Sequence, residues 1–395
     1  MLSGWFQYFL VIGGTCGPAF VMSLILTWLM IRWSPALGLV DRPTVRKNHG
    51  KVTPMGGGIA IAGATLLWFG LFSLTILLIS SSQAIRDQVP EFVAVHIAGA
   101  VSKLDSLWLI LVAAATICLV GLIDDRRGLP WQVRLLMQFG IAGFCVWWQG
   151  WALTAFINIP VLTGGLSILW IVALINSFNM LDNMDGLSAG VAMIVSISLA
   201  AFLMVTVEAT NGAPQYFVAG LLWVLAGSLG GFLFFNRAPA KIFMGDTGSL
   251  FVGFLIAVAT LLATYTGYQS LSPHRILAAP IALAVPFYDM ISVVVIRLRE
   301  GRSPFQADRC HLSHRLENMG MKRSTAVLTI YVLTGICCLC SITLSFVDGY
   351  GAVLLLAIVL LILLLVAMLE QTGSRPTDLQ KSSETSTLVT SEPAN

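Results

Sequence analysis

The sequence predicts an all-α integral membrane protein, built as a bundle of about eleven transmembrane helices. Two observations support this fold class. The 395 residues are 57% hydrophobic and 10% charged, with a mean hydropathy of +0.87, which is far from the balance of a soluble domain. Apolar runs of roughly 20 residues also recur along the whole chain, and each is long enough to cross a bilayer as a helix. A membrane β-barrel would instead show short alternating segments.

The apolar runs define the predicted helices and a single domain. The predicted helices are residues 8–33, 56–80, 104–123, 132–149, 164–180, 187–207, 216–235, 249–267, 275–297, 324–346 and 350–370. After residue 370 the composition changes to Ser, Thr, Glu and Pro, which favours disorder. We therefore predict one polytopic membrane domain over residues 1–370 and a disordered cytoplasmic tail over residues 371–395.

The distribution of basic residues predicts the orientation in the membrane. Lys and Arg collect in cytoplasmic loops, and most of the 22 Lys and Arg residues lie in the odd-numbered loops of this chain. The even-numbered loops hold Arg86, Lys103 and Arg275. The N-terminus is therefore predicted outside and the C-terminus inside, with every odd loop cytoplasmic. A net charge of +3, without a basic run that carries interleaved aromatics, does not indicate nucleic-acid binding.

Four polar stretches interrupt the apolar chain, and the alternation of loops puts all four on the cytoplasmic face. The densest is residues 176–186, where three asparagines and two aspartates follow an apolar run. If this stretch is helical, Asn176, Asn179 and Asn183 share one face. The other stretches are residues 121–127, 236–249 and 308–314. Together they predict one site at the membrane surface.

Five aspartates in these stretches suit a metal ion. Asp124 and Asp125 are adjacent, and adjacent acids repel unless a cation holds both ionised. A charge balance with the two arginines that follow is the alternative. Asp246 lies between glycines just before a long apolar helix, where the helix N-terminus favours phosphate, or where Asp acts as a plain cap. With Asp182 and Asp185, these acids form a hard-oxygen set that suits Mg²⁺.

Other polar groups predict contacts to phosphate. The loop at residues 46–58 combines cations, among them Lys47, with a glycine run that opens the second helix. A positive-inside anchor is the alternative for this loop. His311 and His314 are about one helical turn apart, and no further Cys or His completes a zinc set, so phosphate contacts or solvated residues are favoured. Asp289 lies well inside the ninth helix, where an acid is costly, and it is a further functional candidate unless it pairs with another helix.

At these clusters the sequence resembles the polyprenyl-phosphate N-acetylhexosamine-1-phosphate transferases, also grouped as glycosyltransferase family 4. The matching motifs occur in one order from about Asp41 to Leu316, over residues 47–58, 121–126, 179–187, 243–249 and 286–316. The resemblance implies a bundle of about ten or eleven helices. It also implies a Mg²⁺-dependent transfer, with Mn²⁺ as an alternative cation, of a sugar 1-phosphate from a UDP-HexNAc to undecaprenyl phosphate, with release of UMP.

The resemblance further implies roles for individual residues. Asp124 is the candidate base or positioner for the lipid phosphate, and Asp246 is the strongest candidate metal ligand, with Asp125 close by. By the same resemblance, the nucleotide and metal cleft is lined by Asn179, Asp182 and Asp185, the uracil is held by Asn236 and Phe243, and phosphates are met by Lys47, His311 and His314. Because a phosphate monoester with a second pKa of about 6 is mostly dianionic at pH 7, the reaction does not require Asp124 to remove a proton.

Two residues depart from the family pattern. Ser313 stands where family members often carry the middle histidine of His-x-His-His, and Asn183 stands where glycine is common. The form of residues 308–316 resembles the undecaprenyl-phosphate GlcNAc-1-phosphate transferases, which start O-antigen, teichoic acid or capsule-like polymers. The branch that uses UDP-MurNAc-pentapeptide typically has three consecutive histidines and is the alternative enzyme.

The resemblance implies a multi-pass protein of the bacterial inner (cytoplasmic) membrane with its active site on the cytoplasmic face. Its expected partners are UDP-HexNAc, undecaprenyl phosphate and membrane lipids, and a homodimer is kept as a hypothesis. A polytopic transporter would fit the hydropathy equally well. It would predict ionisable residues near the bilayer midplane and repeated halves, whereas the acids of this chain cluster at one face and Asp289 alone is predicted to lie deep.

Overall fold

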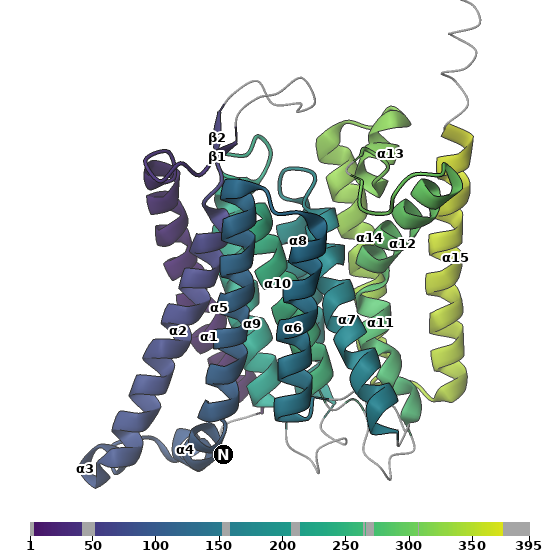
Figure 1. Ribbon diagram of the computed structural model, residues 1–395. Coiled ribbons are helices and arrows are strands. Elements are labelled where there is room, and N and C mark those ends of the chain that lie inside the picture. Colours follow the sequence, from purple (N-terminus) through teal and green to yellow (C-terminus); the bar gives the residue numbers. More distant parts are fainter. Residues whose placement is uncertain are drawn as a thin grey trace, which may run out of the picture.

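The computed structural model describes residues 4–41, 52–151, 159–206, 214–263, 265, 272–306 and 308–373, which form a bundle of helices packed side by side (Figure 1). The elements in chain order are α1 (Gly4–Trp33), β1 (Val40–Asp41), β2 (Thr53–Pro54), α2 (Gly57–Ser81), α3 (Gln83–Arg86), α4 (Glu91–Ser102), α5 (Leu104–Arg127), α6 (Trp131–Gln149), α7 (Pro160–Leu181), α8 (Leu187–Val205), α9 (Tyr216–Asn236), α10 (Gly245–Leu262), the 3₁₀ helix η2 (Pro273–Leu277), α11 (Ala278–Ala282), α12 (Ala284–Arg299), α13 (Leu312–Asn318), α14 (Arg323–Thr343) and α15 (Gly349–Gly373). The all-α membrane class is confirmed.

The number of membrane spans depends on whether α6 is counted and on whether the bent pair before and within α12 is counted as one span. Within the described ranges, nine helices are long and apolar enough to cross a membrane, or ten if one bent pair counts as a single span. α6 is not among them, because Arg134 and three glutamines reduce its apolar character. It nevertheless runs alongside the other long helices of the bundle (Figure 1). The count of eleven spans stays a prediction.

The bent pair corrects the single helix predicted over residues 275–297. The chain forms η2 and α11, breaks at Leu283, and continues as α12 at an angle of 62°. Pro286 explains the break, because proline has no N–H to donate and its ring clashes with the carbonyl four residues earlier. Proline is tolerated in the first turn of a helix, and Pro286 lies in the first turn of α12.

Several short elements lie where the sequence analysis expected loops. The predicted loop over residues 81–103 contains α3 and α4, and α4 has 12 residues, which is too short to cross a bilayer. α13 lies in the loop between α12 and α14, and β1 pairs with β2 as a two-residue antiparallel ladder. These elements escaped the prediction because it searched for runs of membrane-spanning length.

α10 forms the core of the bundle and packs against α2, α5 and α7. Residues 250–259 are buried throughout, as expected for a helix that is apolar on every side. Glycines allow the neighbouring backbones to come close to its first turn. A Cβ on Gly58 would lie 2.2 Å from the Gly248 nitrogen, and a Cβ on Gly121 would lie 2.4 Å from the Asp246 carbonyl oxygen. α2 and α5 therefore contact the N-terminus of α10 backbone to backbone.

The polar stretches gather at one end of this bundle. α5, α7 and α12 end, and α10 begins, at the end that carries β1, β2 and α13 (Figure 1). α15 also ends there, whereas α1 begins at the opposite end. The predicted tail lies beyond the described residues apart from 371–373, which belong to α15.

Replacing Gly121 by alanine should destabilise the protein by about 1–3 kcal/mol, because the added methyl group has no room against the first turn of α10. Gly140→Ala is the matched control, since a Cβ on this α6 residue meets nothing within 4 Å. It should change stability by less than about 1 kcal/mol. Thermal unfolding in detergent compares the two variants, and equal melting temperatures would contradict the close contact.

Candidate active site

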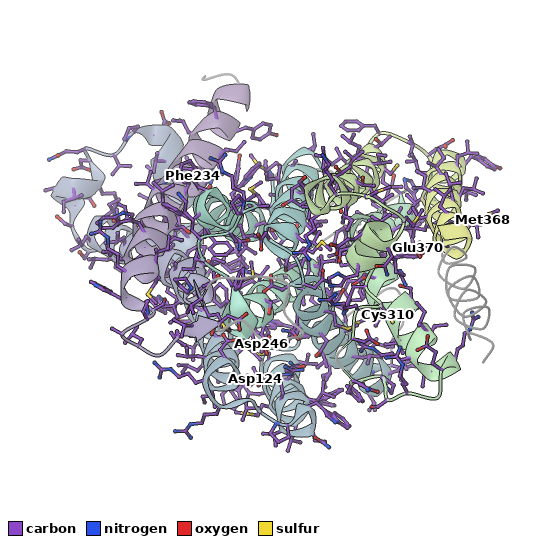
Figure 2. All side chains as sticks on the ribbon, turned by 90° about the horizontal axis from the view of Figure 1, so that it is seen from above. Asp124, Phe234, Asp246, Cys310, Met368 and Glu370 are labelled. Atoms are coloured by element: carbon purple, nitrogen blue, oxygen red, sulfur yellow. The ribbon has the colours of Figure 1, made fainter. Side chains whose placement is uncertain are left out.

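Five aspartates from three parts of the chain meet at the polar end of the bundle. Asp124 and Asp125 are in the last turn of α5, and Asp246 is in the first turn of α10. Asp182 and Asp185 lie in the turn between α7 and α8. Asp124 and Asp246 appear side by side when the bundle is viewed from this end (Figure 2). The structure thus brings together the acids that the sequence analysis grouped.

Arg134 of α6 bridges two of these acids. Its Nη1 lies 2.6 Å from Oδ2 of Asp124 and 3.1 Å from Oδ2 of Asp246. The Asp124 side chain is 7% exposed and that of Asp246 is 32% exposed, so the bridge has one buried and one accessible end. The Leu129 N–H donates to the other oxygen of Asp124 at 2.6 Å. Asp124 therefore has both oxygens engaged and holds Arg134 against Asp246.

Sequence reasoning missed Arg134 as a site residue and counted it only among the cytoplasmic basic residues. A signal was present, because an arginine inside a helix of a membrane bundle is costly and needs a partner. Its helix carries a second polar residue on the same side. Gln138, four residues later, is fully buried and accepts a 2.6 Å hydrogen bond from Nδ2 of Asn176 on α7.

Asp125 caps the N-terminus of α10. Its Oδ1 accepts from the Asp246 N–H at 2.8 Å, and its Oδ2 accepts from the N–H and the hydroxyl of Thr247 at 2.9 and 2.5 Å. These contacts satisfy N–H groups that a helix start leaves without partners. Gly245 is required beside them, because its φ is +69° and a Cβ would lie 2.6 Å from Asp125. The helix therefore begins at Gly245, four residues before the predicted start.

Asn179 and the turn after α7 complete the acidic side of the site. The amide nitrogen of Asn179 donates to Oδ1 of Asp246 at 2.7 Å and to the Ser249 hydroxyl at 3.0 Å. α7 ends at Leu181, so Asn183 lies beyond the helix and does not continue the face of Asn176 and Asn179. The expectation of one shared face was wrong for Asn183, because Asp182, with φ −80° and ψ 57°, leaves the helical conformation and ends α7.

The charge on this turn is poorly balanced. Burial raises the pKa of Asp182 to about 8, and the nearby carboxylates of Asp246, Asp125 and Asp185 act in the same direction. Asp185 accepts a 2.9 Å hydrogen bond from the Ala240 N–H. Without a further cation, ionised Asp182 is therefore unfavourable in this turn, which is the electrostatic condition that suits a bound divalent ion.

Asn236 and Phe243 lie beside the acids, but their polar groups contact the backbone. Asn236 is 4% exposed, and its amide accepts from the Gly186 N–H at 3.0 Å and donates to the Ile242 carbonyl at 2.8 Å. The Phe243 carbonyl accepts from Gly57 N–H at 3.0 Å. These residues tie the α9–α10 connection to the start of α8 and to α2, and their uracil role stays a prediction.

The basic loop is described in part. Lys47 lies outside the described residues. Two N–H groups of the glycine run after it already have partners, because Gly57 and Gly58 donate to the carbonyls of Phe243 and Met244, both at 3.0 Å. Those N–H groups join α2 to the start of α10.

The two histidines belong to α13 and its cap, and the deep acid of α12 supports one of them. Oδ2 of Asp289 lies 2.9 Å from Nδ1 of His311, and its Oδ1 accepts from the Leu312 N–H at 2.6 Å. Asp289 is 1% exposed, and both of its carboxylate oxygens contact the start of α13. Burial lowers the pKa of His314, which therefore stays largely neutral at pH 7.

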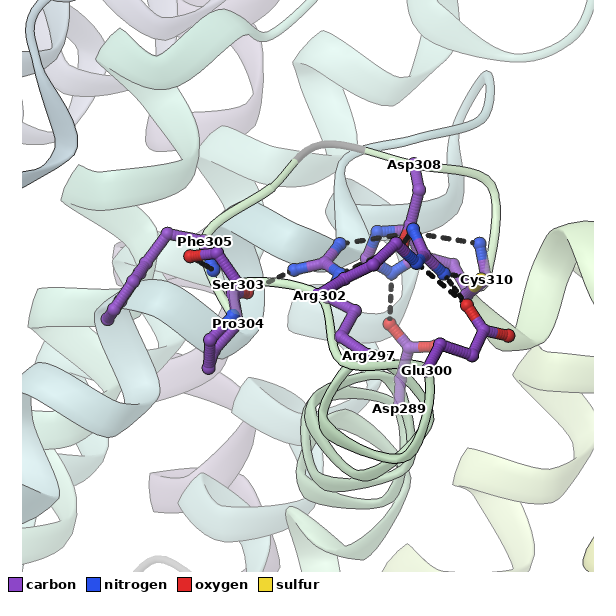
Figure 3. Close-up of polar contacts among 10 residues, drawn as sticks. Asp289, Arg297, Glu300, Arg302, Ser303, Pro304, Phe305, Asp308 and Cys310 are labelled. Atoms are coloured by element: carbon purple, nitrogen blue, oxygen red, sulfur yellow. Dashed lines mark hydrogen bonds and ion pairs between the residues drawn. The ribbon is translucent and has the colours of Figure 1, made fainter.

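A network of arginines and acids fixes the loop that leads into α13 (Figure 3). Arg297 and Arg302 both contact Asp308, at 3.0 and 2.7 Å, and Arg302 also contacts Glu300. Partial burial acts to raise the pKa of Asp308, but these arginines hold it well below its usual value. The loop also reaches α6, where the Phe305 ring stacks on that of Trp131 at a centroid distance of 3.9 Å.

The sequence of this chain is similar to those of known proteins. A family model described as glycosyl transferase family 4 matches residues 107–264. The chain is 31% identical over 371 residues to the "probable undecaprenyl-phosphate N-acetylglucosaminyl 1-phosphate transferase" of Bacillus subtilis, which covers 90% of this chain and 91% of the relative. This chain belongs to glycosyltransferase family 4.

Two further relatives of this family 4 protein carry similar names. A decaprenyl-phosphate N-acetylglucosaminephosphotransferase of Mycobacterium leprae is 31% identical over 82% of this chain and 82% of its own. An undecaprenyl-phosphate alpha-N-acetylglucosaminyl 1-phosphate transferase of Yersinia pestis is 28% identical over 79% of this chain and 78% of its own. The predicted resemblance is thereby confirmed at the level of the family.

Changing Asp125 to asparagine should lower the melting temperature in metal-free buffer, because its one amide oxygen can replace only one of the two carboxylate oxygens that cap α10. Loss of a whole cap costs about 0.5–2 kcal/mol, so this partial loss should cost about 1 kcal/mol or less. Asp105→Asn, an exposed carboxylate at the other end of α5, is the control and should have a smaller effect. If Asp125→Asn melts like the wild type without metal, the capping role is wrong and a pure metal role for Asp125 is favoured.

Proposed function

We propose that this protein transfers N-acetylglucosamine 1-phosphate from UDP-N-acetylglucosamine to undecaprenyl phosphate and releases UMP, as the first membrane step of a cell-envelope polysaccharide. The observation that carries the proposal is the bridge of Arg134 between Asp124 and Asp246, within five acids at one end of a family 4 bundle. Relatives that match most of the chain are named for GlcNAc-1-phosphate transfer to a polyprenyl phosphate. We extend that chemistry to this chain.

The transfer requires one bond to form and one to break. An oxygen of the lipid phosphate attacks the sugar-proximal phosphorus of the donor. The bond from that phosphorus to the bridging oxygen breaks, and the electron pair leaves with UMP. The protein then has little covalent work, so positioning and charge neutralisation account for catalysis. An apolar bundle with its polar groups at one end suits a lipid and a water-soluble nucleotide as the two substrates.

In this scheme Asp124 helps to position the lipid phosphate and does not need to act as a base. Its two oxygens accept from Leu129 N–H and from Arg134, which favours a permanently ionised carboxylate. The lipid phosphate is already largely dianionic at pH 7. Arg134 is then a fixed cation beside Asp246, where it can neutralise charge on a transferring phosphoryl group.

We also propose that the site takes Mg²⁺, or Mn²⁺ in its place. Asp246 would hold the ion, with Asp125 or the acids of the α7–α8 turn close by, and the ion would neutralise charge on the donor pyrophosphate. Among the residues that the structure describes, no group of three or more His, Cys, Asp or Glu side chains is arranged as a ready metal cage. This fits Mg²⁺, which commonly uses one or two carboxylates and completes its shell with water and substrate phosphates.

The cellular setting follows from the same proposal. The described Lys and Arg residues that the sequence assigns to odd-numbered loops and their helix ends, such as Arg126, Arg237 and Arg302, lie at the polar end of the bundle, which supports a cytoplasmic active site in a bacterial inner membrane. UDP-sugars are the donors expected on that side. The homodimer and the disordered cytoplasmic tail remain predictions.

Purified protein should release UMP when it is supplied with undecaprenyl phosphate, Mg²⁺ and UDP-GlcNAc. A panel of UDP-sugars that includes UDP-MurNAc-pentapeptide tests the donor. Asp246→Asn is the matched inactive variant and should keep its fold, because asparagine retains one acceptor for Asn179. Its turnover should fall by at least about 10²-fold. No release with any UDP-HexNAc would refute the proposal, and release with the pentapeptide donor alone would favour the alternative enzyme.

Mg²⁺ binding should strengthen as pH rises from 7 to 9. Below its pKa of about 8 Asp182 is protonated, and above it the carboxylate is ionised and attracts the cation. Binding at pH 7 should therefore release a proton, and binding at pH 9 should not. Calorimetry in two buffers of different ionisation enthalpy measures this release. Asp182→Asn should reduce the pH dependence and leave the part that comes from Asp246, whose pKa burial raises to about 7. An affinity that is constant from pH 7 to 9 in the wild type would contradict the assignment.

A further inference from the structure

The two residues that depart from the family pattern touch each other. The Ser313 hydroxyl donates to Oδ1 of Asn183 at 2.5 Å, across 130 residues of sequence. The amide nitrogen of Asn183 donates to the Met180 carbonyl at 2.8 Å, and this contact fixes the side on which the amide oxygen lies. Ser313 is 1% exposed, so water does not compete for its hydroxyl. The contact is therefore a directed and shielded hydrogen bond.

This hydrogen bond joins two parts of the proposed site. Asn183 lies in the turn that carries Asp182 and Asp185, and Ser313 lies in α13 between His311 and His314. Each of these two parts also makes a hydrogen bond to another helix. Asp289 holds the start of α13 through the His311 ring and the Leu312 N–H, and the Tyr331 hydroxyl donates to the Gly186 carbonyl in the acidic turn at 2.5 Å. The Asn183–Ser313 hydrogen bond therefore connects the acidic turn directly to α13.

We propose that Asn183 and Ser313 form a positioning pair, which sets the distance between the histidines of α13 and the acidic turn so that both meet one pyrophosphate donor. The inference rests on the proposed function. Neither residue has to touch the reacting atoms, because the pair acts through its neighbours in the chain.

The two residues should behave as one unit. A histidine at position 313 alone would collide with the Asn183 amide, whose oxygen lies 2.5 Å from the present hydroxyl. A glycine at position 183 alone would leave a buried hydroxyl without its acceptor. A glycine and a histidine together relieve both problems, because the missing amide leaves room for the imidazole.

A double-mutant cycle on UMP release tests the pair. Asn183→Ala and Ser313→Ala should each lower kcat about tenfold, since small misplacements of catalytic groups have large effects on turnover. KM for the UDP-sugar should change less than about threefold, because the nucleotide keeps its other contacts. The double variant should be no slower than either single variant, because both remove the same contact. Losses that multiply to about a hundredfold would overturn the proposal.

Exchange of the whole pair gives a second, independent readout. Ser313→His alone should be slower than Ser313→Ala, and adding Asn183→Gly should restore kcat to within about threefold of the wild type. A merely structural role for either residue does not predict this rescue. If the added Asn183→Gly fails to raise kcat above that of Ser313→His, the pair does not act as a unit and the proposal is wrong.

Ser188→Ala is the matched control. This buried serine donates to the Phe178 carbonyl at 3.1 Å on the α8 side of the same turn and makes no described link to α13. Its kcat should stay within about twofold of the wild type. Wild-type turnover, measured first, separates the two hypotheses. A wild type that releases no UMP refutes the proposed function, whereas an active wild type with multiplying losses refutes the pair alone.

Discussion

Repulsion among five carboxylates is the constraint on which the polar end of this bundle depends. The protein relieves it in three ways. Arg134 lies between Asp124 and Asp246, backbone N–H groups donate to Asp125 and Asp185, and burial leaves Asp182 easier to protonate. These contacts do not compensate all of the negative charge, and the remaining charge would attract a divalent cation.

The position of α10 makes this gathering of acids available. Because α10 is apolar on every side it is buried in the bundle, and its first turn reaches the polar end between α2 and α5. Gly58 and Gly121 let these neighbours contact its backbone, and Asp125 caps it from α5. The same residues that stabilise the helix start therefore fix Asp246 against Arg134.

The second half of the site is organised around α13. Arg297, Arg302 and Asp308 hold the preceding loop, and Asp289 orients His311. Ser313 then connects this helix to Asn183 in the acidic turn. Asp289, a buried acid that the sequence marked as costly, contacts His311. The two residues that depart from the family pattern contact each other.

The sequence by itself determined the membrane class, the long helices and the identity of the acids, because hydropathy and the scarcity of charge are properties of composition and local order. It could not show that Asp125 caps the start of α10, since that depends on which N–H groups lie within 3 Å of its carboxylate. It indicated Arg134 only as one of many cytoplasmic basic residues, and it gave no sign that Asn183 and Ser313 are in contact. The tertiary structure decided these points, because hydrogen bonds and ion pairs depend on distances between segments far apart in the chain.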